Sequence, residues 1–442
     1  MILIGNGIVV TRDEANNIIY NGAVLVEGNR ITDIGEYTVL RAKYPKARFI
    51  NAKGNLIMPG FINTHMHYYS TFARGINNDS PQPKCFTDIL KGLWWRLDKV
   101  LTLEDVYYSA LVPMIDQVKN GVTTVFDHHA SPYAITDSLF KIAEAARYVG
   151  IRSNLCYETS DRDGEVRALE GIKENVDFIN YCNKINDDML KATFGLHASM
   201  TISDKTLDKC LASIAGLDTG FHVHCAEGIE DVIDSKQKYG KGVIERWYER
   251  GVLGKKTIAV HCIHITEHEM DLLKETDTIV VHNPESNMGN AVGCSPVLKM
   301  YEKGIMLGLG TDGYTTDMME SYKVGNLIHK HENKDSNVAW VEIPKMLFEN
   351  NRKIAQRFIS KEIGVLKKDA LADIIIVDYN APTPITKDNI NSHLLFGVNG
   401  RNVITTMIDG KVIMENRELV NIDEERIMAR SVELAQEVWK RF

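Results

Sequence analysis

The residues that could do chemistry begin with two histidines separated by one residue, His65 and His67. They follow the apolar run 56–62, which Pro59 and Gly60 punctuate, and this pattern predicts a short buried strand. Because side chains two positions apart on a strand point to the same face, both imidazoles could bind one metal ion. An isolated pair of this kind is more often two polar residues at the end of a strand. The metal interpretation therefore depends on further ligands downstream.

Three later segments contain candidate metal ligands or proton-transfer residues. Each segment is an apolar run of the kind that forms a buried strand, with a candidate residue at its end. His224 ends the first, with Glu227 three residues further on, His261 ends the second, and Asp312 closes the third. A metal ion beside a carboxylate is what a metal-assisted hydrolase needs, because the ion activates water and the carboxylate moves protons. Alone, an aspartate such as Asp312 is more often a turn or helix-capping residue. Beside three candidate histidine ligands, it becomes a natural oxygen ligand.

The middle of the chain contains the elements that would position these side chains. Residues 59–365 alternate apolar runs with amphipathic stretches, which is typical of parallel strand and helix units. Eight such units predict a (β/α)8 barrel of the TIM type, whose chemistry gathers at the C-terminal ends of the strands. The expected strand ends lie near His65, Asp127, Tyr157, His197, His224, His261, His282 and Asp312.

Both ends of the chain differ from this middle. Residues 1–58 and 366–442 contain short β-type segments separated by Asn and Gly, and neither end has enough strands for a domain alone. We expect them to join into one small β-sandwich with a C-terminal helix, next to the catalytic barrel 59–365. The predicted fold class is therefore α/β.

The charge and the cysteine content of the chain exclude some classes of function. The net charge of −8 and the pI near 6.0, without a cluster of Lys and Arg, argue against a nucleic-acid partner. The seven scattered cysteines include no Cys-x-x-Cys pair, which disfavours a disulfide framework and fits a reducing compartment. No targeting segment or long apolar run is visible, so we expect a cytoplasmic enzyme without a membrane span.

The spaced motifs resemble the amidohydrolase superfamily, in its mononuclear cytosine-deaminase and chlorohydrolase-like branch. The resemblance covers nearly the whole chain, and segments 94–98 and 127–132 resemble an aminohydrolase subgroup of that branch. It implies one divalent ion, zinc in first place with Fe2+ or Mn2+ as alternatives. The implied ligands are His65, His67, His224 and Asp312.

The resemblance also implies roles around the ion. Glu227 would relay a proton to the ring nitrogen or leaving group, Asp312 would take the proton of water, and His261 would orient the attacking oxygen. His197 matches a substrate-binding histidine of the deaminase relatives. Binuclear relatives have a bridging lysine at the end of the fourth strand; here Lys191 precedes that strand, which favours one ion over two.

The long segment after His67 would cover the site, because loops that follow barrel strands do so. Trp94 could stack on a flat heterocycle, and Arg74 could bind the polar edge of such a ring. For at least one of Trp94 and Trp95, packing of an amphipathic helix that begins near Thr87 is the better explanation.

Three functions are consistent with these features. The first is hydrolytic deamination of an amidine-type C–NH2 group on a purine-like or pyrimidine-like nitrogen heterocycle. The second is hydrolysis of a cyclic amide or a ring C–Cl bond by the same site. The third is a non-catalytic metal-containing binding protein, against which Glu227 and His261 argue, since neither is needed to bind zinc. The partner is then a small-molecule heterocyclic substrate, and the resemblance implies a homodimer.

Overall fold

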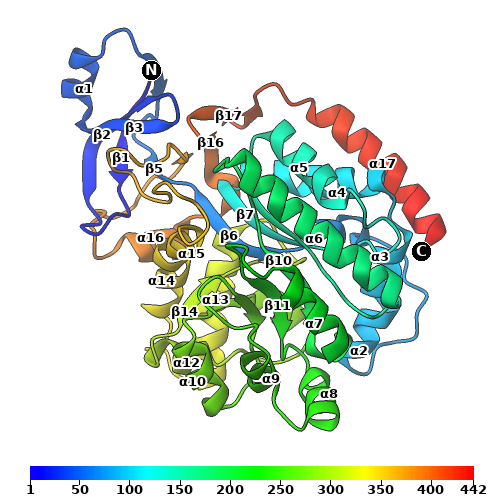
Figure 1. Cartoon of the computed structure of the whole chain (residues 1–442). Helices are drawn as coiled ribbons and strands as arrows, with labels where there is room; N and C mark the ends of the chain where they lie inside the picture. The colour runs from blue at the N-terminus through cyan, green and yellow to red at the C-terminus, as the bar shows by residue number, and fades with distance from the viewer.

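The computed structural model describes residues 1–442 and consists of a strand-and-helix barrel beside a sheet made from both ends of the chain (Figure 1). The barrel strands pair in parallel in two groups, and the isolated bridges Met66–Asp312 and Thr159–Leu196 join the groups into a closed ring. The predicted α/β barrel is therefore confirmed. Its eight strands are β6 (Phe61–Met66), β7 (Val122–His129), β8 (Arg152–Tyr157), β10 (Phe194–Ala198), β11 (Phe221–Cys225), β12 (Ile258–His261), β13 (Ile279–His282) and β14 (Met306–Leu309).

Helices cover the outside of the barrel, which explains why its strands are buried along almost their whole length, even where β7 and β8 contain several polar residues. Local sequence marks where helices begin: Thr102 and Thr266 each accept a hydrogen bond from the backbone three residues on, and Asp105 and Glu269 complete the two capping boxes. The main outer helices are α4 (Leu103–Lys119), α5 (Ser138–Val149), α6 (Glu165–Ile185), α7 (Asp204–Ser213), α8 (Ile229–Tyr239), α9 (Val243–Glu249), α10 (Glu267–Glu275), α12 (Val297–Glu302), α13 (Met318–Asn333) and α15 (Asn351–Ala355).

The two ends of the chain meet in one nine-stranded sheet, as the sequence predicted. The strands that were expected to form a sandwich are hydrogen-bonded side by side in a continuous sheet. Strand β5 joins the two ends of the chain, because it pairs with β1 on one side and with β15 on the other. The members are β1 (Ile2–Val10), β2 (Ile18–Glu27), β3 (Arg30–Glu36), β4 (Arg48–Asn51), β5 (Leu56–Pro59), β15 (Ile374–Val377), β16 (Val403–Ile408), β17 (Lys411–Glu415) and β18 (Glu418–Leu419).

Gly60 connects this sheet directly to the first barrel strand, because it separates β5 from β6. Its N–H donates to the carbonyl of Asp373 at 3.1 Å. A Cβ at position 60 would lie 2.2 Å from Cγ2 of Thr123. Nearby, the buried guanidinium of Arg152 on β8 lies 3.0 Å from Oδ2 of Asp373. The accessory sheet therefore fixes the strand that contains His65.

The segment after β6 lies over the C-terminal end of the barrel. It contains η1 (Tyr68–Ala73), α2 (Phe86–Ile89), η2 (Leu90–Trp94) and α3 (Trp95–Val100). Helix α17 (Glu424–Arg441), red in Figure 1, packs on α4 and α3, and Nε1 of its Trp439 donates to the carbonyl of Phe72 at 2.8 Å. The helix expected from Thr87 is therefore present as a continuous helical segment, with a π-helical turn at Leu90–Trp94.

Shorter elements complete the chain, and none of its helices has the length and apolar character that a membrane span requires. They are α1 (Tyr37–Lys43), β9 (Leu190–Ala192), η3 (Ser199–Thr201), α11 (Pro284–Gly289), α14 (Glu342–Lys345), η4 (Met346–Asn350), α16 (Ile390–Gly397) and η5 (Gly400–Asn402).

Candidate metal centre and active site

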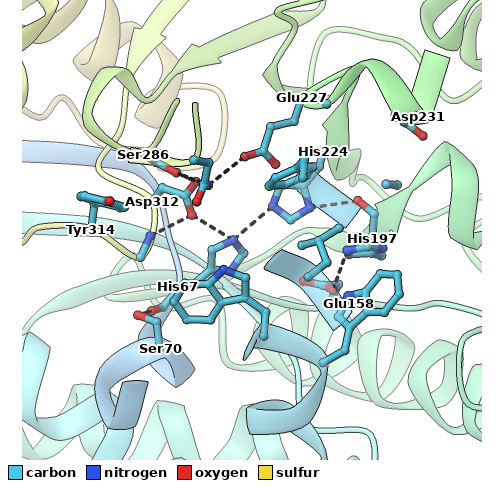
Figure 2. A pocket seen from close by; sticks show the side chains of 18 of the residues that line it. His67, Ser70, Glu158, His197, His224, Glu227, Asp231, Ser286, Asp312 and Tyr314 are labelled. Atoms are coloured by element: carbon cyan, nitrogen blue, oxygen red, sulfur yellow. Dashed lines mark hydrogen bonds and ion pairs between the residues drawn. The ribbon is translucent and has the colours of Figure 1, made fainter. Parts of the chain in front are cut away.

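The four predicted metal ligands meet at the C-terminal end of the barrel. Figure 2 shows His67, His224 and Asp312 among them. Nε2 of His67 lies 3.1 Å from Nε2 of His224 and 3.2 Å from Oδ1 of Asp312. Nε2 of His65 lies 3.8 Å from the same oxygen of Asp312. All four side chains are buried or nearly so. Residues from the first, fifth and eighth barrel strands therefore converge on one point.

The hydrogen bonds of the outer ring nitrogens show that this point suits a cation. Nδ1 of His67 lies 2.5 Å from the carbonyl oxygen of His128, and Nδ1 of His224 lies 3.0 Å from that of His197. A carbonyl only accepts, so both Nδ1 atoms donate, and each neutral imidazole has its lone pair at Nε2. The two lone pairs face each other at 3.1 Å, and Nε2 of buried His65 has no partner. A positive ion between them removes this conflict.

The donor set agrees with the predicted cofactor. Imidazole nitrogens and one carboxylate are ligands that zinc and similar divalent ions accept, and outer hydrogen bonds commonly orient such ligands. Asp312 is oriented in this way: Oγ of Ser286 donates to its Oδ2 at 2.7 Å, and the N–H of Gly313 donates to its Oδ1 at 2.8 Å. The buried cluster fits a single divalent ion such as zinc.

Backbone strain accompanies the same strand ends. Ala226, His261 and Asp312 have φ values of 48°, 70° and 55°. This left-handed region is costly for residues other than glycine, and such residues gather at functional sites.

Glu227 and His261 lie on one side of the cluster. Nε2 of His261 is 3.4 Å from Oε2 of Glu227 and 3.6 Å from Oδ2 of Asp312. The side-chain amide of Asn287 lies 2.8 Å from Nδ1 of His261 and holds the ring in place. Burial, with a smaller contribution from the charge of Asp312, raises the pKa of Glu227 well above its ordinary value. A carboxyl group in this environment binds a proton readily, which suits proton transfer.

A pocket of about 730 Å³ opens onto the cluster. Its wall includes two of the three predicted substrate contacts, His197 and Trp94, the latter packed edge-to-face on Tyr69. The structure does not bring Arg74 to this pocket: it lines a neighbouring hollow that shares Trp94 and Asp312 with it. Flat aromatic walls and a few polar groups suit a heterocyclic ligand.

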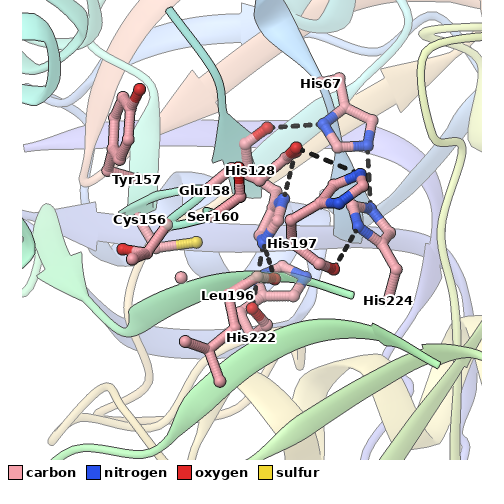
Figure 3. A network of polar contacts seen from close by, with 12 residues as sticks. His67, His128, Cys156, Tyr157, Glu158, Ser160, Leu196, His197, His222 and His224 are labelled. Carbon is pink, nitrogen blue, oxygen red and sulfur yellow. Dashed lines mark hydrogen bonds and ion pairs between the residues drawn. The ribbon is translucent and has the colours of Figure 1, made fainter. Parts of the chain in front are cut away.

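Several residues of the pocket were not singled out from the sequence. Tyr314 and Asn290 line it from loops, and no local pattern marks them. Glu158 lies in the wall beside His128 and His197 (Figure 3). Its only sequence signal is its place directly after β8, at a strand end near which ligands were expected elsewhere in the barrel.

A closed α/β barrel with such a cluster at its strand ends has the arrangement of a metal-dependent hydrolase. The model of the amidohydrolase family matches residues 56–413, and that of a bacterial imidazolonepropionase-like composite domain matches residues 22–47. The chain belongs to the amidohydrolase family and is a hydrolase that acts on carbon–nitrogen bonds. The predicted superfamily and enzyme class are therefore confirmed.

Similar proteins cover nearly the whole chain. A 5'-deoxyadenosine deaminase of Methanosarcina barkeri is 31% identical, with 100% of this chain and 99% of that protein covered. A 5-methylthioadenosine/S-adenosylhomocysteine deaminase of Caldanaerobacter subterraneus is 33% identical, with 94% and 93% covered. A zinc-bound adenosine deaminase structure from Xanthomonas campestris has a TM-score of 0.88 at 22% identity, over 99% of this chain and 98% of the other. At that identity the structural match shows the fold alone.

Proposed function

We propose that the protein is a hydrolytic deaminase that releases ammonia from an amino group on a purine-like heterocycle. One observation carries the proposal: Glu227, His261 and Asp312 lie together beside a histidine cluster that fits a divalent ion. Relatives about one third identical over nearly their full length are named as deaminases of adenosine derivatives, which supports the same class of reaction.

In this proposal His65, His67, His224 and Asp312 hold one divalent ion. When bound there, the ion would lower the pKa of a water molecule and hold it for attack. Asp312, whose oxygens also face His67 and His261, receives the first proton of the water. The Nε2 atom of His261 orients the water oxygen toward the ring carbon.

Glu227 moves the protons that the reaction needs. It first protonates the ring nitrogen beside the attacked carbon, then takes up the second proton of the water and delivers it to the departing amine. The proton held by Asp312 returns to Glu227 and restores the starting state. A C–O bond forms, the C–N bond breaks, and the products are an oxo-substituted ring and ammonia. Burial raises the pKa of Glu227 well above its ordinary value, which suits a group that both gives and takes a proton.

The pocket walls would bind the ring. Trp94 and Tyr69 supply aromatic faces and edges, and His197 contacts the ring from the end of β10. Arg74 has no role in this proposal, because it lines the neighbouring hollow.

We also propose the domain boundaries, the cellular location and the oligomeric state of the enzyme. Residues 1–58 with 366–442 form the accessory domain, and residues 59–365 form the catalytic barrel. The protein acts in the cytoplasm as a homodimer and binds no nucleic acid, in keeping with its net charge of −8 and the lack of a basic cluster.

A coupled ammonia-release screen of the zinc-loaded protein tests the proposal. The panel contains aminopurines, oxopurines, aminopyrimidines and pterins, and we expect ammonia from at least one amino-substituted ring. Ring-opened acids without free ammonia would instead establish hydrolysis of a cyclic amide.

A further inference from the structure

Glu158 is a buried carboxylate in the pocket wall that the proposed reaction does not use. Its oxygens lie 3.3 Å from Nδ1 of His128, 3.4 Å from Nε2 of His197 and 3.8 Å from the guanidinium of Arg162 (Figure 3). All three distances exceed the roughly 2.7–3.2 Å of an ordinary N–H···O bond. A carboxylate has about four acceptor sites, so Glu158 keeps acceptor capacity for a ligand.

The surroundings of Glu158 favour its anionic form. Burial alone would raise its pKa, but His197, His128 and Arg162 together hold the pKa of this carboxyl well below its usual range. Arg162 itself is fixed behind the wall: it lies 2.7 Å from Oδ2 of Asp98 and stacks on Trp95. Glu158 therefore accepts hydrogen bonds and donates none.

Glu158 and Glu227 lie on opposite sides of His224 (Figure 2). A carboxylate oxygen of Glu158 and one ring nitrogen each of His67, His128 and His224 all lie within 4.8 Å of one another. On the other side, the ligand atoms of Glu227, His261 and Asp312 also lie within 4.8 Å of one another. The reacting carbon would thus have a proton-giving carboxyl on one side and an acceptor-only carboxylate on the other.

This asymmetry matches one class of amino heterocycle. In a cyclic guanidine, such as a 2-amino-4-oxopyrimidine ring, the carbon with the amine lies between an unprotonated ring nitrogen and a ring N–H. In the adenine ring of a nucleoside, the same carbon lies between a ring nitrogen and a carbon, and no ring N–H is present. An anionic carboxylate stabilises the first arrangement and gains nothing from the second.

We propose that Glu158 determines specificity by accepting a hydrogen bond from a ring N–H beside the amine-bearing carbon, so that the substrates are cyclic guanidines of the 2-amino-4-oxopyrimidine type. This inference rests on the proposed deaminase function. Water supplies the oxygen, ammonia leaves, and Glu158 gains or loses no proton during the reaction. The preference distinguishes this chain from relatives named for adenosine derivatives.

Two matched substrate pairs test the proposal with the zinc-loaded full chain: guanine with 1-methylguanine, and pterin with 3-methylpterin. Each methyl group replaces the ring N–H beside the amine-bearing carbon. We expect kcat/KM to be about 10- to 100-fold higher for the N–H member, which corresponds to a hydrogen bond to a charged group. 5'-Deoxyadenosine is the third arm, and its preferential turnover would overturn the inference.

The variant Glu158→Gln keeps the shape of the side chain and removes its charge. We expect kcat/KM for the N–H substrates to fall about 10- to 100-fold, with unchanged zinc content and thermal unfolding. Glu170→Gln, a partly exposed change on α6, is the matched control. Unchanged kinetics in Glu158→Gln would overturn the proposal, and loss of zinc would show that Glu158 holds the ion instead.

Equilibrium binding separates this inference from the proposed function. Quenching of tryptophan fluorescence, with Trp94 and Trp95 in the pocket wall, reports binding without turnover. If no ring releases ammonia, the deaminase proposal fails. Tighter binding of guanine than of 1-methylguanine, lost in Glu158→Gln, would still support the role of Glu158, and equal binding of the pair would refute it.

Discussion

The Nε2 atoms of His67 and His224 face each other at 3.1 Å, while the Nδ1 atom of each ring lies against a backbone carbonyl. Two neutral imidazoles held in this way present lone pair to lone pair. The barrel builds this repulsive arrangement from the ends of two strands that are not neighbours, and a cation at the centre would relieve the repulsion.

Metal content is the first prediction. The purified protein should bind about one zinc ion per chain, and His65→Ala combined with His67→Ala should abolish binding because two of four ligands are lost. Elemental analysis measures this directly, and chelation should lower the unfolding temperature of the wild type but not of the double variant. Two ions per chain, or full retention in the double variant, would contradict the assignment.

Glu227→Gln is the second prediction. The change preserves shape but removes the proton acceptor, and a general acid–base group typically contributes about 100- to 10,000-fold to turnover. We expect kcat to fall by that range while zinc content stays constant. Glu249→Gln, an exposed change on α9, should behave as the wild type. Normal turnover in Glu227→Gln would show that its role is structural.

The third prediction concerns Gly60. Gly60→Ala places a Cβ 2.2 Å from Cγ2 and 2.4 Å from Oγ1 of Thr123, so either β6 or β7 must shift. Overpacking of this kind costs about 1–3 kcal/mol in the free energy of unfolding, and the shift should also weaken zinc binding through His65 and His67. Denaturant unfolding and zinc titration measure the two effects. Adding Thr123→Ala removes both atoms and should restore part of the loss; no rescue would refute the steric explanation.

Glu285 supplies a prediction on pH. Burial, then the charges of Glu320 and Asp317, raise its pKa to about 8 against the hydrogen bond from Ser321. The folded state therefore retains a proton that the unfolded state loses above its lower pKa. The contribution of Glu285 to the free energy of unfolding is therefore fully present at low pH, and it declines as the pH rises from about 4.5 to about 8.

Glu285→Gln removes this titration. Relative to the wild type, the variant should gain stability between pH 5 and pH 8, with an upper limit of about 1.4 kcal/mol for every tenfold difference in proton affinity between the folded and unfolded states. Urea unfolding at both pH values gives the difference. A constant gap between the two proteins would mean that Glu285 titrates normally when folded.

Much of the fold was predictable because the barrel strands are short, apolar and separated by helical stretches. Their ends could be placed, and with them His65, His224 and Asp312, since a barrel gathers its strand ends on one face. Lys191 lies 3.0 Å from Asp188 and outside the cluster, on the short strand β9 that precedes β10, where its side chain is largely buried and not solvated as expected.

The positions of Glu158 and Arg74 could not be read from sequence in the same way. The role inferred for Glu158 depends on its contacts with His128 on β7 and His197 on β10. These two residues lie beside the end of β8 in space but are distant from Glu158 in sequence. Arg74 follows η1 in a long connection whose path depends on packing with α17 and other distant segments. Local patterns contain no information on such contacts.

Strand β5 has one neighbour, β1, that is made early in translation and another, β15, that is made near its end. A nascent chain therefore has β5 with one edge unpaired, and β6, which contains His65 and is followed by His67, comes directly after it. Such an edge is where aggregation begins and where a chaperone would bind. Because Asp312 also comes from the last barrel strand, the metal centre can form only after most of the chain has left the ribosome. Zinc capture is thus a late step of assembly.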